Sequence, residues 1–168
     1  QPNILLYAMK VMHVDHLRTG FLVCAMTVGL GLGCVLAGRV SDKKVELGLV
    51  PLGAIGLSLF SIMLGLVSGS YFLAMMVMFL LGVSCGFYIV PLNTLIQQKS
   101  PSDKRGQVLA TNNVLSFSAI LLGSVFLYFL RDILHLNAAQ IFVAAGTLTI
   151  IGTVYITTLL PYALIRFI

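Results

Sequence analysis

Long apolar runs, separated by short polar and charged segments, dominate this sequence. Between positions 47 and 98 there is no Asp, Glu, Lys, Arg or His. Because a hydrocarbon core of about 30 Å takes about 20 helical residues, this stretch is long enough for two helical passes joined by a tight turn. The turn is expected at Ser68-Gly69-Ser70, and basic segments flank the hairpin at 39–44 and 99–105. The pattern therefore predicts a polytopic membrane protein.

The same pattern predicts five complete spans and one partial span. The complete spans contain no charge and are continuously apolar, so we expect α-helices, since an open strand edge in lipid leaves backbone groups without partners. They are expected at 19–38, 47–67, 71–97, 107–130 and 138–160. A stub at 2–11 precedes them and has the pattern of the end of a helix that begins upstream. The predicted fold class is an all-α, polytopic membrane protein.

Composition agrees with this interpretation. The chain is 59% hydrophobic and only 9% charged, whereas soluble domains carry about 25% charged residues. A water-soluble chain of this length could not bury so much apolar surface. The net charge of +5 comes from residues in short loops and not from one amphipathic face, so no nucleic-acid partner is expected. The expected partner of these basic loops is the lipid bilayer, through its anionic headgroups.

Lys and Arg are distributed unequally between the two sides of the predicted bundle. One side carries seven, namely Arg39, Lys43, Lys44, Lys99, Lys104, Arg105 and Arg166. The other side carries three, namely Lys10, Arg18 and Arg131. Because the loops are short, the positive-inside rule applies and the richer side is expected to be cytoplasmic. This prediction makes the loops at 39–46 and 98–106 and the C-terminus cytoplasmic.

Five spans and a stub make six helices, which is the number in one half of a twelve-helix transporter built from two six-helix halves. The other half of the same transporter is then an expected partner. Two small-xxx-small spacings, Gly29-x-x-x-Gly33 and Gly82-x-x-x-Gly86, let helix backbones approach closely. They indicate either helices that rock against each other or ordinary membrane-helix packing. One helix face is expected to be nearly free of side chains, through Gly29, Gly31, Gly33 and Gly38.

Uncharged polar residues are the candidate binding groups within the spans. They are Asn93, Gln97, Thr111, Asn112, Asn113 and Ser116. Asn93 lies six residues before Lys99 and Asn112 lies seven after Arg105, so both are expected about 9–10 Å from the same membrane edge. The candidate substrate-binding residues are Asn93, Gln97, Asn112, Asn113 and Ser116. The alternative is that they form interhelical hydrogen bonds, each contributing about 0.6 kcal/mol.

No catalytic constellation, metal site or cofactor site is expected in this segment. His13 and His16 lie three apart, with Asp15 between them, but a zinc site needs three or four ligands at suitable spacing. A solvated loop is the preferred interpretation. Three cysteines lie inside apolar spans without metal or redox spacing and are interpreted as packing residues, namely Cys24, Cys34 and Cys85.

The loop that begins at Cys34 and ends at Lys44 resembles the cytoplasmic signature of the major facilitator superfamily. Arg39, Lys43 and Lys44 occupy the basic positions of that signature. Cys34 and Ser41 replace its glycines and Gly38 replaces its acidic residue. The resemblance implies a gating role for the basic loops, with the candidates Arg39, Asp42, Lys43, Lys44, Lys104 and Arg105.

Four segments together resemble one branch of this superfamily, the bacterial lysophospholipid transporters. They are 33–39, 45–53, 88–93 and 100–113. The resemblance implies that the chain is the C-terminal half of such a transporter in the bacterial inner membrane. It also implies a lysophosphatidylethanolamine-type substrate that is moved inward. In that branch the transporter occurs alone or fused to an acyltransferase and an acyl-carrier-protein synthetase.

Three functions remain open at this stage. The first is a transporter segment that moves lysophospholipid across the membrane by alternating access. The second is a proton-coupled carrier of a small solute or drug, which predicts membrane-embedded acidic residues in the other half of the transporter. The third is a membrane anchor for a fused phospholipid acyltransferase. The segment itself is not expected to be an enzyme, and the activity of the full-length protein stays open.

Overall fold

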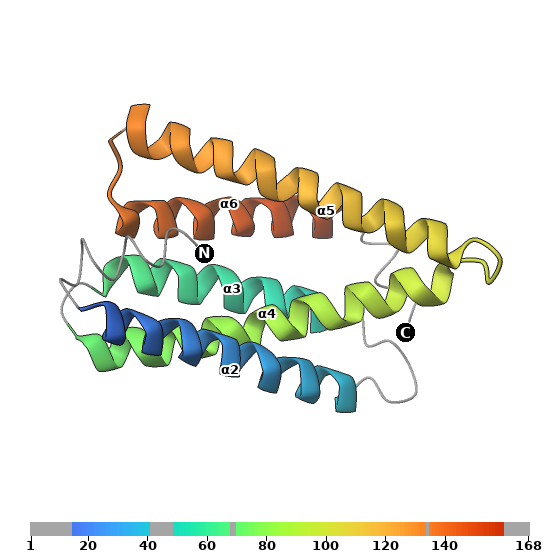
Figure 1. Cartoon of the computed structure of the whole chain (residues 1–168), viewed down its shortest axis with the longest axis horizontal. Coiled ribbons are helices and arrows are strands. Elements are labelled where there is room, and N and C mark those ends of the chain that lie inside the picture. Colours follow the sequence, from blue (N-terminus) through green and yellow to red (C-terminus); the bar gives the residue numbers. More distant parts are fainter. Residues whose placement is uncertain (1–14, 41–48, 68–69, 134, 160–168) are drawn as a thin grey trace.

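The structure, a computed structural model, describes residues 15–40, 49–67, 70–133 and 135–159. This part of the chain is all-α (Figure 1). The helices are α2 (His16–Val40), α3 (Leu49–Leu66), α4 (Tyr71–Lys99), α5 (Arg105–Tyr128), the π-helix η2 (Phe129–Ile133) and α6 (Ala138–Leu159).

The described chain contains five helices that are long and apolar enough to cross a bilayer. The prediction of an all-α chain with five membrane-crossing helices is therefore confirmed. The helices begin and end within three residues of the positions expected from the sequence. The expected stub at 2–11 and the centre of the expected turn, Ser68 and Gly69, lie outside the described residues.

Local chemistry defines the ends of α4. At its start, Ser70 is the N-cap, and its hydroxyl oxygen accepts a 3.5 Å hydrogen bond from the N–H of Leu73. At its end, the N–H and the hydroxyl of Ser100 both donate to the carbonyl of Ile96. Pro101 follows, and the residue before a proline is disfavoured in the α-helical region, so the helix stops there.

The N-terminal ends of α2 and α4 are connected by Arg18 and Tyr71. The Tyr71 hydroxyl donates a 2.9 Å hydrogen bond to the Arg18 carbonyl. The guanidinium carbon of Arg18 lies 6.0 Å from the centre of the Tyr71 ring, which is within the range of a cation–π contact. The two helices are thus joined at the side of the bundle where the sequence places fewer basic residues.

Helices α2 and α4 form the most extensive helix pair, and glycines form their contact. A Cβ added to Gly29 would lie 2.1 Å from the Phe79 carbonyl oxygen, and one added to Gly82 would lie 2.2 Å from that of Met26. A Cβ on Gly33 or Gly86 would also meet the opposite backbone at less than 3 Å. The two small-xxx-small spacings therefore meet each other.

The prediction of a single glycine face on α2 is wrong in part. Gly29 and Gly33 contact α4, but a Cβ on Gly31 or Gly38 would have nothing within 4 Å. Positions two apart on an α-helix point about 200° apart, so Gly31 cannot share the face of Gly29 and Gly33.

Helix α3 packs against both α4 and α6 (Figure 1). The hydroxyl of Ser61, which is 9% exposed, donates a 2.8 Å hydrogen bond across to the carbonyl of Phe142 on α6. A Cβ on Gly146 of α6 would lie 2.9 Å from the Ser58 carbonyl oxygen on α3. The buried cluster of the bundle comprises Leu22, Leu64, Ala74, Val77, Met78 and Ala138.

Helix α5 differs from the other four membrane-length helices because none of its residues is buried. It contacts α4 sparsely, and it runs at an angle to the rest of the bundle, nearest to α4 beside the 100–105 connection (Figure 1). Large apolar side chains along it are widely exposed, as in Leu115 at 64% and Leu122 at 71%. An apolar helix in this state needs lipid or further protein around it.

Candidate functional site

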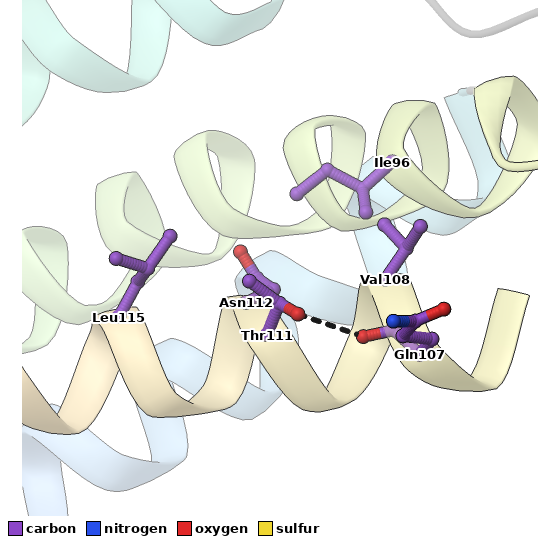
Figure 2. Close-up of a pocket in the computed structure, with 6 residues that line it drawn as sticks. All are labelled: Ile96, Gln107, Val108, Thr111, Asn112 and Leu115. Carbon is purple, nitrogen blue, oxygen red and sulfur yellow. Dashed lines mark hydrogen bonds between the residues drawn. The ribbon is translucent and has the colours of Figure 1, made fainter. Parts of the chain in front are cut away.

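A groove lies between α4 and α5, near the connection that joins them. Its volume is about 370 Å³, which is within the usual range of about 300–1,000 Å³ for ligand sites. The lining residues are Ile96, Gln107, Val108, Thr111, Asn112 and Leu115. Val108, Asn112 and Leu115 point from α5 toward α4, and Ile96 points from α4 toward α5 (Figure 2).

The helical repeat brings the α5 residues of this groove together. Positions 107, 108, 111, 112 and 115 follow the spacing of a single helix face. The Thr111 hydroxyl donates a 3.0 Å hydrogen bond to the Gln107 carbonyl one turn earlier (Figure 2). The Ser116 hydroxyl donates in the same way, at 2.8 Å, to the Asn112 carbonyl.

Besides the Thr111 hydroxyl, the polar side-chain groups of the groove are two amides. Asn112 is half-buried and Gln107 is exposed. Neither side-chain amide makes a hydrogen bond to any residue in the part of the chain that the structure describes. An amide without a partner in an apolar environment costs free energy, so these two groups are available for a ligand or for another segment of protein.

Of the five candidate substrate-binding residues, only Asn112 lines this groove. Asn93 and Gln97 lie on α4 with exposed side chains, outside the groove. Asn113 and Ser116 lie on α5 and are also exposed outside it. The side chains of Asn112 and Asn113 thus point in different directions, because consecutive residues of an α-helix are rotated by about 100°. Substrate binding by all five residues stays a prediction.

The candidate gating residues lie at helix ends. Arg39 is exposed in the last turn of α2. Lys104 is the N-cap of α5 and Arg105 is its first residue. Both are exposed and precede Gln107, the first α5 residue of the groove, by three and two positions. The other three gating candidates lie outside the described residues, namely Asp42, Lys43 and Lys44.

Ile96, Gln107, Val108 and Leu115 line the groove but are not among the polar groups that the sequence singled out. Thr111 is one of those polar groups, although it is not among the five candidate substrate-binding residues. A signal for the α5 members was present, because their spacing follows one helix face that is polar near its start and apolar further along. Nothing in the sequence shows that this face of α5 turns toward Ile96 of α4. The groove lining contains no titratable side chain, so its residues can bind a ligand by hydrogen bonds and apolar contact.

Among the described residues, no group of three or more His, Cys, Asp or Glu side chains is placed to hold a metal ion. The described cysteines Cys24, Cys34 and Cys85 are free thiols.

Comparison with the models of known protein families gives a match. The family model of the Major Facilitator Superfamily matches residues 2–124, which is well over half of the chain. No curated protein and no solved structure matches.

Proposed function

Because this chain belongs to the major facilitator superfamily and its function is therefore membrane transport, we propose that its substrate is a lysophospholipid of the lysophosphatidylethanolamine type. The observation that carries the proposal is the resemblance of four sequence segments, 33–39, 45–53, 88–93 and 100–113, to the lysophospholipid branch. The fourth of these segments lines the groove, because it contains Gln107, Val108, Thr111 and Asn112.

The chemistry of the described spans supports a lipid substrate. The stretch 47–98 has no Asp, Glu, Lys, Arg or His, so these two spans offer a substrate only apolar surface and uncharged polar groups. The alternative, a proton-coupled carrier of a small solute, places its titratable groups in the other half of the transporter. A lysophospholipid can leave its acyl chain in an apolar groove while its polar headgroup crosses. Uncharged amides such as that of Asn112 are then sufficient partners for the headgroup on this side of the path.

The exposed surface of α5 supports a second part of the proposal, namely that the chain is the C-terminal six-helix half of a twelve-helix transporter. An apolar helix without a buried residue leaves room for the other half to pack against it. We place this transporter in the bacterial inner membrane, with the loops at 39–46 and 98–106 on the cytoplasmic side. A fused or separate acyltransferase on that side would receive the transported lipid.

The proposal is tested by uptake of labelled lysophosphatidylethanolamine into spheroplasts, with and without the complete gene that encodes this segment. Uptake is expected to require the gene. An uncoupler arm tests the alternative, because a proton-coupled carrier loses uptake when the proton gradient collapses. Equal uptake in cells with and without the gene contradicts the lysophospholipid assignment, and gene-dependent uptake of a small soluble solute in its place supports the alternative carrier.

A further inference from the structure

We propose that the α4–α5 groove is a binding site for a single-tailed phospholipid of the adjacent leaflet. The phosphate lies beside Lys104 and Arg105, and the first part of the acyl chain lies between Ile96, Val108 and Leu115. This inference rests on the proposed function and specifies where the transported lipid meets the protein at the basic side of the membrane.

The two ends of the α5 lining match the two ends of such a lipid. Arg105 begins the helix, Gln107 and Val108 follow at about 3 and 5 Å along the axis, Asn112 at about 10 Å and Leu115 at about 15 Å. The charge thus lies at the surface end and the deepest lining side chain is aliphatic, with amide and aliphatic side chains alternating between them. The phosphate and the acyl chain of a lysophospholipid lie at the corresponding ends, and its glycerol and ester lie between them.

The charge of the segment that precedes the groove residues of α5 suits an anionic phosphate. The segment 99–105 contains three basic residues, Lys99, Lys104 and Arg105, and one carboxylate, Asp103, so it carries a net charge of +2. Lys104, Arg105 and Asp103 are all exposed. Cationic side chains at the membrane surface attract anionic lipid groups.

The polar lining suits the glycerol and ester region of the lipid. The side-chain amides of Gln107 and Asn112 have no hydrogen-bond partner among the described residues. An amide can donate to an ester carbonyl or phosphate oxygen and can accept from a glycerol hydroxyl. A lysophospholipid offers all of these groups, because it keeps one free glycerol hydroxyl.

The apolar lining and the volume argue for one acyl chain. Ile96 approaches from α4, while Val108 and Leu115 approach from α5 (Figure 2). These three aliphatic side chains would gain nothing from a small polar solute. A volume of about 370 Å³ is near the lower end of the range for ligand sites. This volume suits the first part of one acyl chain better than two complete acyl chains.

The test uses the complete polypeptide in nanodiscs with a lysophosphatidylethanolamine that carries a photoactivatable group near the start of its acyl chain. Crosslinked peptides are mapped by mass spectrometry. We expect the label on the peptides that contain Ile96 and residues 107–115. An excess of unlabelled lysophosphatidylethanolamine is expected to compete and abolish the crosslinking. An excess of glycerophosphoethanolamine, which has no acyl chain, is expected to leave the crosslinking unchanged.

Matched variants connect the label to the groove. Leu115→Trp fills the apolar end and is expected to lower labelling by about tenfold, whereas Leu122→Trp is expected to leave labelling unchanged. Leu122 is the same residue type on the same helix, is 71% exposed and does not line the groove. Asn112→Leu keeps a side chain of similar size but removes the amide. Because one hydrogen bond to the lipid is lost, labelling is expected to weaken by about three- to tenfold.

The outcomes separate this inference from the proposed function. Labelling outside the groove with intact lipid flipping overturns the groove assignment and leaves the proposed function standing. Labelling of the groove without any flipping supports the binding site and contradicts lysophospholipid transport. Competition by glycerophosphoethanolamine overturns the inference in favour of a soluble ligand. Efficient disulfide formation between Leu115→Cys and a cysteine on another helix of the polypeptide overturns it in favour of a protein segment in the groove.

Discussion

At the scale of single residues, glycine position decides how closely two membrane helices pack. Lipid tails are as apolar as the helices, so hydrophobic burial does not drive helices together, and close backbone contact becomes the main source of association. Gly29 and Gly33 lie against the backbone of α4, and Gly82 and Gly86 lie against the backbone of α2. Gly31 lies in the same helix with open space where its Cβ would be, and this contrast gives a direct test.

We expect Gly33→Ala to destabilise the protein by about 1–3 kcal/mol, because the new Cβ must displace backbone atoms and overpacking of this kind has such a cost. The Cβ would lie 2.3 Å from the Val83 carbonyl oxygen. The measurement is the unfolding of the complete polypeptide in mixed micelles.

Gly31→Ala is the matched control for this substitution. Its Cβ meets nothing within 4 Å, and alanine favours the helix over glycine by up to about 1 kcal/mol. Its stability is therefore expected to stay equal or to rise. Equal destabilisation by both variants would contradict the glycine contact between α2 and α4.

At the scale of helices, most hydroxyl groups are satisfied within their own helix and do not join neighbours. The Ser58 hydroxyl donates a 2.8 Å hydrogen bond to the Ala54 carbonyl, one turn earlier. The Ser84 hydroxyl donates a 3.0 Å hydrogen bond to the Leu80 carbonyl in the same way. Ser61 is different, because its hydroxyl reaches the Phe142 carbonyl on another helix. The pairing of α3 with α6 therefore combines close glycine packing with one hydrogen bond between the helices.

We expect Ser61→Ala to lower the stability of the α3–α6 pair by about 0.6 kcal/mol, the average for a hydrogen bond between membrane helices. Ser58→Ala is the control, since Ser58 is also buried on α3 but donates to its own helix. Its effect is expected to be close to zero, because the Ala54 carbonyl keeps its backbone partner. Unfolding in mixed micelles measures both variants, and an equal effect would contradict a special role for Ser61.

At the scale of the whole molecule, four of the helices form a connected bundle and α5 stands apart. Helix α4 packs on α2 and α3, and α3 packs on α6, while α5 has no buried residue. Charges lie at the helix ends on both sides of the bundle, with the excess of Lys and Arg on the side of the α4–α5 connection. From this asymmetry the positive-inside rule predicts the orientation of the molecule in the membrane.

We expect Ser102→Cys to be cytoplasmic and Asp132→Cys to be external, after Cys24, Cys34 and Cys85 are replaced by alanine. Both positions are exposed and lie at opposite ends of α5 and η2. A membrane-impermeant maleimide is expected to label Asp132→Cys in intact spheroplasts, and Ser102→Cys only after permeabilisation. The reversed pattern would contradict the predicted orientation.

The sequence by itself determined that this chain crosses a membrane as helices, and it placed the ends of those helices within three residues. The reason is that transfer into lipid acts on each segment independently: a charge-free run of about 20 residues must enter, and its backbone must form its own hydrogen bonds there. The superfamily also followed from the sequence, because Arg39 and its neighbours carry a local signature. The family match over residues 2–124 confirms it.

Only the tertiary structure decided which helix faces meet. The two glycine spacings were visible in the sequence, but their contact, and the open position of Gly31, depend on how α2 is rotated against α4. Candidate amides such as Asn93 and Asn112 were placed at equal depth from the sequence, yet only Asn112 lines the groove. Depth follows from residue number along one helix, whereas the direction of a side chain depends on rotation and crossing, which packing between distant segments determines.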